Sequence, residues 1–349
     1  MNALITANFD SDALDRFERD FGMNVTYRPI GDREARFPPE ETKELIEDVD
    51  VFVVGYEEVS ADIMDVADSL RLIGCPRGGP DANIDIAAAT ERDIPVVYAP
   101  GRNAISVADM TLGLILGVVR HIPRAHHLLH EGVYTGEPES NASGEREDVT
   151  WGVAKNTPYM DLKGPELDGT VLGIIGFGAI GRLVAERASG FGMEIVAADP
   201  FIDAETMAER DVEKVELDGL LARSDVVTVH SPVTDETRGM IGEAEFGRMK
   251  ESAYFINTAR AALTDQLALV RELEAGGLRG AALDVYDDEP LPENHPLFDL
   301  PNVVTTPHIA GAAEEVPARG AKLVTDGIEA VLNGNEPEHI ANPETIPSV

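Results

Sequence analysis

The amino-acid sequence predicts an α/β protein built on parallel β-sheets, with a smaller N-terminal domain followed by a larger one. Three observations predict this fold class. Short apolar runs alternate with charged, helix-like segments in the first hundred residues, and the alternation becomes regular after Thr170. A glycine-rich turn separates the first apolar run of the regular region from the helical stretch that follows. The length of 349 residues suits two domains.

The strands expected in the N-terminal domain are short apolar runs, which are Ala3–Thr6, Val51–Val54, Leu70–Cys75 and Pro95–Tyr98. Charged, helix-like segments lie between these runs, so we expect a small parallel α/β domain. The single cysteine, Cys75, follows an apolar run. We therefore expect a buried thiol there, with no internal disulfide and no cysteine-based zinc site.

A long helix is expected next. Ser106 and Asp109 have the spacing of a capping box, which predicts the helix start. The apolar run that continues to Val119 predicts burial on most sides, and Pro123 should kink the helix or start a new one. The segment Thr135–Lys163 is rich in Gly, Pro, Ser, Asn and Glu and contains the only tryptophan, so we expect a long loop.

The region after Thr170 predicts a doubly wound parallel sheet buried on both faces by helices. Its expected strands are Val171–Ile175, Ile195–Ala198, Val226–Val229, Tyr254–Ile256, Ala281–Val285 and Val303–Thr305. Amphipathic helical stretches lie between most of them, and Glu314–Leu332 predicts one more helix.

The charge balance excludes some classes of partner. The chain has 64 acidic and 28 basic residues, which gives a formal net charge of −36. A basic surface for nucleic acid or anionic membranes is therefore not expected. Acidic residues occur in nearly every segment, which favours adaptation to a high-salt cytoplasm where cations screen the repulsion. The N-terminus lacks a signal-peptide pattern and the longest apolar run is too short to span a bilayer, so we expect a cytoplasmic protein.

The glycine-rich turn has the sequence G-x-G-x-x-G at Gly176, Gly178 and Gly181, between a strand and a helix. The first glycine permits the tight turn, the second lets the backbone approach a pyrophosphate, and the third allows close helix–strand packing. Free N–H groups at the helix start favour the phosphates. Asp199 ends the next strand, 18 residues after Gly181, where a carboxylate binds ribose hydroxyls and repels a 2′-phosphate. The sequence therefore predicts a dinucleotide site that prefers NAD to NADP.

Polar side chains also follow three later strands, in the segments Asn257–Arg260, Leu283–Pro290 and Thr306–Gly311. Ligands of a doubly wound sheet bind at the carboxyl ends of its strands, so these segments should face the cofactor. Four histidines, His121, His126, His127 and His130, cluster earlier in the chain, and His126 and His130 should share a helical face. No third ligand or metalloprotease pattern accompanies them, so we expect no metal site.

These motifs resemble the D-isomer-specific 2-hydroxyacid dehydrogenase family from about Gly74 to the C-terminus. The matching stretches are Asn83–Asp85, Asn103–Ala108, the glycine turn, His230–Pro232, Met249–Lys250 and the three polar segments. The resemblance implies that Arg260 pairs with the substrate carboxylate and polarises the C2 oxygen. His308 would be the general acid for keto-acid reduction and the base for oxidation. Glu289 would hydrogen-bond His308, orient it and favour its protonated form.

The resemblance also implies the rest of the site. Asp284 and the backbone near Thr258 would hold the nicotinamide, and the loop of Gly78 and Gly79 would offer N–H groups to the substrate carboxylate. The expected cofactor residues are Gly176, Gly178, Ala179, Ile180, Gly181, Asp199, Ser231, Thr258, Ala259, Asp284 and Gly311, and the expected substrate residues are Arg77, Gly78, Gly79 and Arg260.

The architecture implied by the resemblance has two Rossmann-like domains. A doubly wound NAD-binding domain at residues 103–311 would be inserted into a smaller, flavodoxin-like substrate domain formed by residues 1–102 and 312–349. The chain would form a homodimer, with the helix after Asn103 near the interface. The small-domain loop reads Pro76–Pro80, whereas many members carry G-x-G there with a small residue between. The Thr135–Lys163 segment is also longer than in typical members.

Alternative functions stay open at this stage. Within the family, the substrate could be phosphoglycerate specifically. A non-catalytic, NAD-sensing protein similar to the family's corepressors would carry the same three residues, and an assay of NADH oxidation with small 2-keto acids separates it from an enzyme. Formate dehydrogenase, which resembles this fold, pairs its histidine with glutamine, and Glu289 argues against it. Arg77 either pairs with surface acids or recognises a second anionic or strongly polar group of the substrate.

Overall fold

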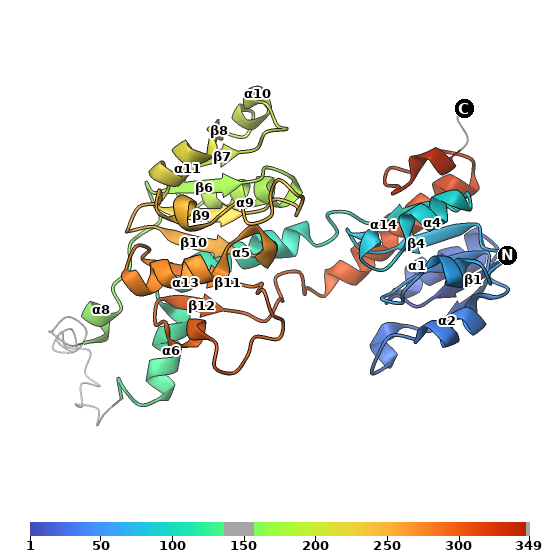
Figure 1. Cartoon of the computed structure of the whole chain (residues 1–349), viewed down its shortest axis with the longest axis horizontal. Helices are drawn as coiled ribbons and strands as arrows, with labels where there is room; N and C mark the ends of the chain where they lie inside the picture. Colours follow the sequence, from blue (N-terminus) through green and yellow to red (C-terminus); the bar gives the residue numbers. More distant parts are fainter. Residues whose placement is uncertain (136–156, 347–349) are drawn as a thin grey trace, which may run out of the picture. The chain divides into compact units, whose positions relative to one another are not determined.

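The computed structural model describes residues 1–135 and 157–346 (Figure 1). The chain forms two compact units, Met1–Asn103 together with Ala312–Val349, and Ala104–Gly311. We call them unit 1 and unit 2. Compared with the expected domain boundaries, this division assigns Asn103 to unit 1. Most of the loop expected at Thr135–Lys163, including its tryptophan, lies outside the described residues. A short helix, α8 (Pro158–Asp161), lies in its described part, where only loop was expected.

Unit 1 is a five-stranded parallel sheet with helices around it. Its strands are β1 (Asn2–Ile5), β2 (Asn24–Tyr27), β3 (Val51–Val53), β4 (Leu72–Cys75) and β5 (Val96–Tyr98). Its helices are α1 (Ser11–Asp15), α2 (Pro39–Ile46), α3 (Ala61–Met64), α4 (Ile86–Glu91) and α14 (Glu315–Leu332), with a π turn at Arg16–Asp20 and 3₁₀ turns at Ile30–Asp32, Pro80–Ala82 and Pro343–Thr345. The strand order β2-β1-β3-β4-β5 is that of flavodoxin-like sheets.

The helix α14 returns from the far end of the sequence to pack on β4 and β5 of unit 1. Its apolar face, with Ala321, Val324 and Ile328, joins the core under the sheet. Gly74 in β4 makes this packing possible, because a Cβ atom there would lie 2.7 Å from Cγ1 of Val324. The neighbouring Cys75 is buried, as expected from the sequence, and burial raises the pKa of its thiol.

Unit 2 is a seven-stranded parallel sheet. Its strands are β6 (Val171–Ile175), β7 (Glu194–Ala198), β8 (Glu213–Lys214), β9 (Val226–Val229), β10 (Tyr254–Asn257), β11 (Gly280–Leu283) and β12 (Val303–Thr305). The helices of unit 2, besides α8, are α5 (Ala104–Val119), α6 (Ile122–His130), α9 (Ala179–Ser189), α10 (Ala204–Ala208), α11 (Leu217–Arg223), α12 (Glu243–Phe246) and α13 (Gln266–Ala275), with 3₁₀ turns at Ala261–Leu263 and Pro296–Asp299. The order β12-β11-β10-β9-β6-β7-β8 reverses between β6 and β9. That reversal marks the ligand-binding crevice of a Rossmann sheet, and it confirms the predicted fold class.

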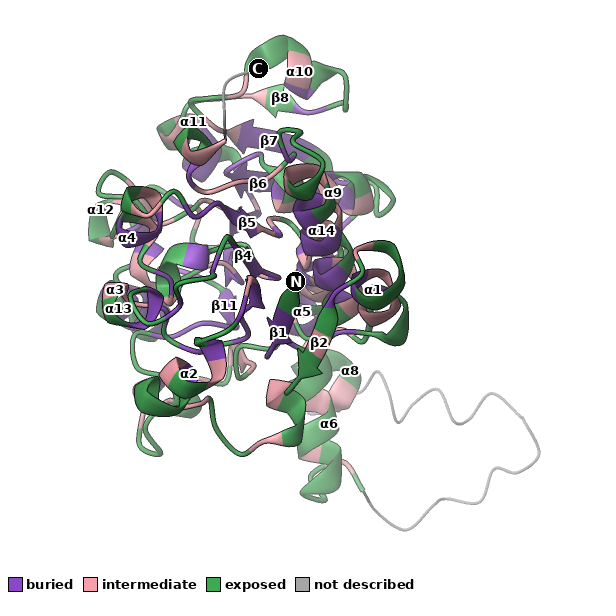
Figure 2. Ribbon diagram, turned by 90° about the vertical axis from the view of Figure 1, so that its right-hand side faces the viewer, coloured by how far each residue is buried: buried purple, intermediate pink, exposed green. Residues whose placement is uncertain are grey.

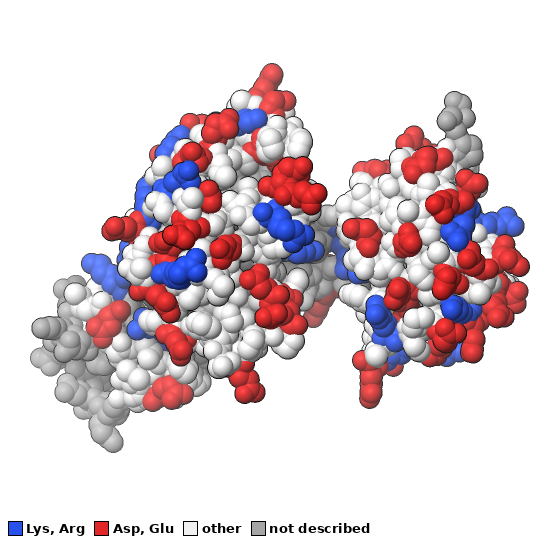
Figure 3. All heavy atoms as spheres, viewed as in Figure 1, with Lys and Arg blue, Asp and Glu red and all other residues white. Residues whose placement is uncertain are grey.

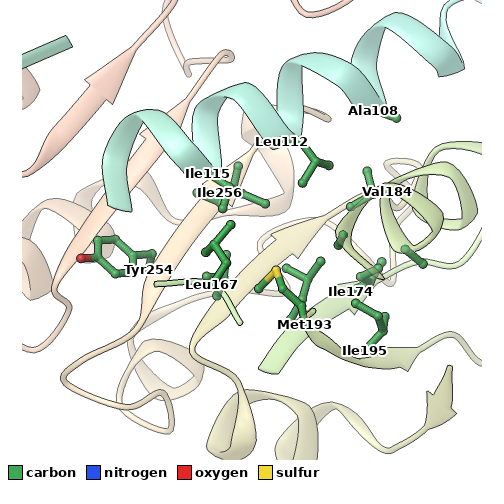
Figure 4. Packing of buried hydrophobic residues seen from close by; sticks show 14 of the residues in the cluster. Ala108, Leu112, Ile115, Leu167, Ile174, Val184, Met193, Ile195, Tyr254 and Ile256 are labelled. Carbon is green, nitrogen blue, oxygen red and sulfur yellow. The ribbon is translucent and has the colours of Figure 1, made fainter. Parts of the chain in front are cut away.

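The strands of both sheets are buried while their helices keep exposed outer faces (Figure 2). In unit 2, α5 packs across the sheet beside α9, and Leu112 and Ile115 of α5 meet Val184 of α9 and Ile256 of β10 in one cluster (Figure 4). This burial on both faces explains the nearly continuous apolar strands in the sequence.

The start of α5 differs from the sequence-based expectation. The helix begins at Ala104, so Ser106 lies in its first turn and the capping box predicted there is wrong. The expectation for Pro123 is confirmed. A new helix, α6, begins at Ile122 with Pro123 in its first turn, after His121 adopts a left-handed φ of 56°, and the two helices meet at a bend of 61°.

No single helix among the described residues is long and apolar enough to cross a membrane, and only α5 and α6 taken together reach that length and composition. Carboxylates are spread over the visible face of each unit rather than gathered in one patch (Figure 3).

Candidate active site

The glycine turn of unit 2 has the backbone that the motif predicts. Gly176 adopts a φ of +89°, and a Cβ atom on it would lie 2.7 Å from the Ser231 hydroxyl. A Cβ atom on Gly181 would lie 2.3 Å from the carbonyl oxygen of Gly176. Both positions therefore require glycine for reasons of packing within the chain.

Gly178 is different, because a Cβ atom added to it would meet no protein atom within 4 Å. It is exposed and stands at the N-cap of the 11-residue helix α9, with Ala179 and Ile180 in the first turn. The first N–H groups of a helix have no acceptor within it and favour anions. The open surface at Gly178 thus fits the pyrophosphate of a dinucleotide.

Asp199 holds the glycine turn in place. One of its carboxylate oxygens accepts the N–H of Phe177 at 2.8 Å, and the other accepts the N–H of Phe201 at 2.8 Å. Asp199 is partly exposed at the end of β7, beside the turn. This is the position in which a carboxylate meets the adenosine ribose of a bound dinucleotide.

The remaining predicted residues of unit 2 follow β10, β11 and β12, which are adjacent in the sheet. Thr258 is buried and its hydroxyl lies 2.9 Å from that of Thr111 on α5. The N–H of Ala259 donates to the side chain of Asn257 at 3.0 Å. Arg260 is exposed, and Nη1 of its guanidinium donates to the carbonyl of Ala259 at 2.7 Å. This bond uses one of its five N–H donors, so most of the guanidinium remains available to a ligand.

His308 and Glu289 form a hydrogen-bonded dyad. Nδ1 of His308 lies 2.7 Å from Oε2 of Glu289, and about half of the His308 side chain is exposed, with a relative accessibility of 47%. Oε1 of Glu289 accepts the N–H of Tyr286 at 3.1 Å. Because Nδ1 is engaged, the proton that His308 exchanges with a ligand must be on Nε2.

The charges around the dyad affect Glu289. Burial tends to raise the pKa of Glu289, but hydrogen bonds from His308 and Tyr286, together with the positive charges of His308 and Arg260, bring this pKa below its usual value. Glu289 therefore remains a carboxylate at neutral pH. The influence of Arg260 also shows that its guanidinium is close to the dyad.

Asp284 anchors the loop that carries His308. It is fully buried, and its carboxylate accepts the Thr306 hydroxyl at 2.6 Å and the N–H groups of Ile309 and Ala310 at 2.9 and 2.7 Å. These bonds hold a loop in which His308 has a left-handed φ of 56°. The nicotinamide contact expected for Asp284 remains a prediction, and its contact with the His308 loop is a finding that the sequence did not suggest.

A cavity of about 610 Å³ opens beside the dyad in unit 2. Glu289 and His308 contribute to its wall, which otherwise includes Pro290, Leu291 and Phe298. Tyr286 also lines it, with its hydroxyl donating to the carbonyls of Leu283 and Thr306 at 2.8 and 2.9 Å. The dyad is thus accessible to a small molecule.

The predicted substrate residues Arg77, Gly78 and Gly79 lie in unit 1, in the loop after β4. Gly78 and Gly79 are exposed, and the carbonyl of Arg77 accepts the N–H of Ala99 at 3.0 Å. Arg77 itself is only partly exposed and forms no ion pair among the described residues. Its guanidinium therefore does not form the surface pair that the sequence left open.

Among the residues that the structure describes, no group of three His, Cys, Asp or Glu side chains is arranged to hold a metal ion. The rings of His126 and His130 lie 4.3 Å apart, so these two histidines share a helical face as expected.

Comparison with known proteins decides the family. The profile of the D-isomer specific 2-hydroxyacid dehydrogenase, NAD binding domain matches residues 112–310, more than half of the chain. The chain belongs to the D-isomer-specific 2-hydroxyacid dehydrogenase family. This confirms the resemblance seen in the motifs, and the matched domain includes the glycine turn, Asp199 and the dyad.

Individual members of the family are similar to this chain over most of its length. A glyoxylate reductase of Thermofilum pendens is 40% identical over 83% of this chain and 80% of its own. A D-3-phosphoglycerate dehydrogenase of Methanocaldococcus jannaschii is 39% identical over 88% of this chain, which spans only 54% of that relative's length. A solved protein of Thermus thermophilus is 34% identical, with a TM-score of 0.78 and coverage of 98% and 100% of the two chains.

Proposed function

We propose that this family member is an NAD-dependent D-2-hydroxyacid dehydrogenase that moves a hydride between C4 of the nicotinamide and C2 of a small 2-keto or 2-hydroxy acid. The observation that carries the proposal is the 2.7 Å contact between His308 and Glu289 at the strand ends of the NAD-binding unit, close to Arg260. A proton donor, its carboxylate partner and a free arginine are the groups that keto-acid reduction requires.

His308 would protonate the substrate oxygen from Nε2 during reduction and accept the same proton during oxidation. The carboxylate of Glu289 stabilises the imidazolium form and fixes the ring through Nδ1. Arg260 would bind the substrate carboxylate with its free guanidinium edge and polarise the C2 oxygen. When bound, NADH supplies the hydride to C2, so that one hydride and one proton convert the ketone to the alcohol.

The cofactor would bind along the strand ends of unit 2. Gly176, Gly178, Ala179, Ile180 and Gly181 would hold the pyrophosphate, and Asp199 would bind the adenosine ribose and disfavour a 2′-phosphate. Ser231, Thr258, Ala259, Asp284 and Gly311 complete the proposed site. The loop of Arg77, Gly78 and Gly79 in unit 1 would contact the substrate.

We further propose that the chain works as a homodimer in a salt-rich cytoplasm. The first proposal follows from the family, and the second follows from the net charge of −36. Sedimentation at molar potassium chloride would show a species of twice the chain mass, and a monomer at micromolar concentration would contradict the dimer.

The decisive experiment is NADH oxidation with pyruvate, glyoxylate, hydroxypyruvate and 2-ketobutyrate at high salt, followed by chiral analysis of the product. Turnover that yields the D-hydroxy acid supports the proposal. Tight NADH binding with no turnover on any of these acids would contradict it and favour the NAD-sensing, corepressor-like alternative.

A further inference from the structure

Three loops at one edge of the unit 1 sheet bring together side chains that the proposed chemistry has not used. Tyr56 follows β3, Arg77 follows β4 and Arg102 follows β5. The three strands are parallel and adjacent, so their carboxyl ends lie along the same edge. Carboxyl ends of parallel strands are where sheets of this class bind ligands.

Arg77 is held in a defined position by two contacts. Its guanidinium carbon lies 4.7 Å from the centre of the Tyr56 ring, and its Nη2 donates to the side chain of Asn83. Asn83 in turn donates to the carbonyl of Glu57, which fixes it to the same loop as Tyr56. Nε of Arg77 is buried and has no hydrogen-bond partner in the described part of the chain. A buried donor without an acceptor is rare in folded proteins, so Arg77 retains unused capacity to bind an acceptor.

Arg102 lies next to Arg77. Burial lowers the pKa of Arg102; the Tyr56 side chain opposes this shift, and the nearby positive charge of Arg77 adds to it. The glycine at position 320 of α14 leaves room for the arginine, because a Cβ atom there would lie 3.0 Å from Cδ of Arg102. The side chain of Arg319 donates to the backbone carbonyl of Arg102, which adds a third guanidinium near the loops.

These two cations lack the acidic partner that the composition would readily supply. Neither Arg77 nor Arg102 forms an ion pair with any described carboxylate, although the chain has 64 acidic residues. Arg33, beside the same Tyr56 loop, shows the contrast, because it pairs at 2.8 Å with the fully buried carboxylate of Glu57. Two adjacent, partly desolvated guanidiniums repel each other, and an anion between them would relieve that cost.

We propose that Arg77 and Arg102 form an anion-binding site for a second negatively charged group of the substrate, separate from the carboxylate that Arg260 binds. The ligand class is a 2-keto or 2-hydroxy acid that bears a further carboxylate or phosphate. Arginine suits either group, because its planar fork donates two parallel hydrogen bonds to a pair of oxygens. Stacking on Tyr56 leaves that fork oriented while covering one face of the guanidinium. The inference rests on the proposed dehydrogenase function and names its substrate class.

The test compares matched substrates that differ in the second charge. One pair is hydroxypyruvate and 3-phosphohydroxypyruvate, and the other is 2-ketopentanoate and 2-oxoglutarate. For each pair, the ratio of kcat/KM for the dianion to kcat/KM for the monoanion is measured at constant ionic strength in the wild type and in the Arg77→Ala, Arg77→Lys and Arg102→Lys variants. The pair with the larger wild-type ratio shows whether phosphate or carboxylate is the natural group.

We expect Arg77→Ala to lower that ratio by about 10- to 100-fold, the range for a lost hydrogen bond to a charged group. Arg77→Lys and Arg102→Lys keep the charge but lose the fork, so each should lower the ratio by a smaller factor. The matched control is Arg92→Ala, which removes an arginine that pairs with Asp65 on the surface of the same unit and should leave the ratio unchanged. Equal losses for both members of a pair, or none for either, would overturn the site.

A binding measurement separates this inference from the proposed function. Calorimetric titration of the full chain with inorganic phosphate, at fixed potassium chloride concentration, tests the site without turnover. The wild type and Arg92→Ala should bind phosphate at least ten times more tightly than Arg77→Ala. Equal affinity in all three proteins would refute the anion site even if the enzyme is active. Selective binding without turnover of any keto acid would uphold the site and contradict the dehydrogenase.

Discussion

Nδ1 of His308 and Oε2 of Glu289 lie 2.7 Å apart, and the second oxygen of the same carboxylate is bonded to the backbone of Tyr286. Glu289 is thus fixed at both oxygens before it contacts the imidazole. The loop of His308 is fixed separately by the buried carboxylate of Asp284. Two acidic residues with different partners therefore set the position of one imidazole, and Nε2 remains the ring atom for proton exchange.

The first prediction concerns His308. Replacing it with alanine removes the proposed proton donor while leaving the glycine turn intact, so keto-acid reduction should fall by about 10² or more and NADH should still bind. Steady-state turnover and NADH titration measure the two effects. His130→Ala, which alters an exposed histidine of α6, is the matched control and should behave as the wild type. Near-normal turnover in His308→Ala would show that another group donates the proton.

Glu289→Gln tests the partner of that histidine. The attraction that lowers the pKa of Glu289 acts equally on the imidazolium, so the neutral amide should destabilise the protonated ring. Reduction needs that proton, and its rate should begin to fall at a lower pH than in the wild type. The measurement is a pH profile of kcat/KM for both proteins. A profile that keeps its midpoint would contradict the role given to Glu289.

Cofactor choice is the second subject of prediction, and it depends on Asp199. A carboxylate at this place should favour NADH, and Asp199→Ala should raise the ratio of kcat/KM with NADPH to that with NADH. The same change removes acceptors for the N–H groups of Phe177 and Phe201, so the efficiency with NADH should also fall. Asp199→Asn keeps an acceptor for the turn and separates charge from structure. A wild type that uses NADPH as well as NADH would contradict the assignment.

Most strands were predictable because they are buried on both faces, which leaves continuous apolar runs such as Val171–Ile175 and Val226–Val229 in the sequence. Two strands were missed, and both lack that signal. β2 is an edge strand with mostly exposed side chains, and β8 has only two residues. The start of α5 was misplaced because Ser106 and Asp109 mimic a cap inside the helix, and cap patterns do not locate a boundary unaided.

The site was predictable where one side chain carries one role in a motif, as for the glycines, Asp199, Glu289 and His308. Contacts between segments distant in sequence were not predictable. The Thr111–Thr258 hydroxyl contact and the support of Thr306 by Asp284 depend on how α5 and the last loop pack on the sheet. The clustering of Tyr56, Arg77 and Arg102 likewise arises from the order of the strands, which no local pattern encodes.

The third prediction concerns His230, whose pKa is lowered to about 3 by burial. In the unfolded chain this histidine binds a proton below about pH 6.5. Between that pH and about 3, the unfolded state holds a proton that the folded state refuses, so the free energy of unfolding should decrease by up to about 1.4 kcal/mol per pH unit on acidification. His230→Gln does not titrate and can keep a hydrogen bond to Thr228, the partner of the imidazole at 3.0 Å. Urea unfolding at several pH values should show a shallower decline in the variant, and parallel declines would refute this account.

The last prediction concerns salt. With a net charge of −36 and carboxylates spread over both units, repulsion between like charges should oppose the folded state in dilute buffer (Figure 3). Screening shortens the reach of that repulsion from about 30 Å at 0.01 M salt to about 3 Å at 1 M. The melting temperature should therefore rise steeply with potassium chloride over this range and flatten above it, where screening is nearly complete. Sucrose is the matched control, because it stabilises folded proteins by exclusion without screening charge, and at low salt it should recover only part of the gain. A melting temperature that stays constant from dilute buffer to molar potassium chloride would refute the adaptation to high salt, since the folded state would then tolerate its charge without screening.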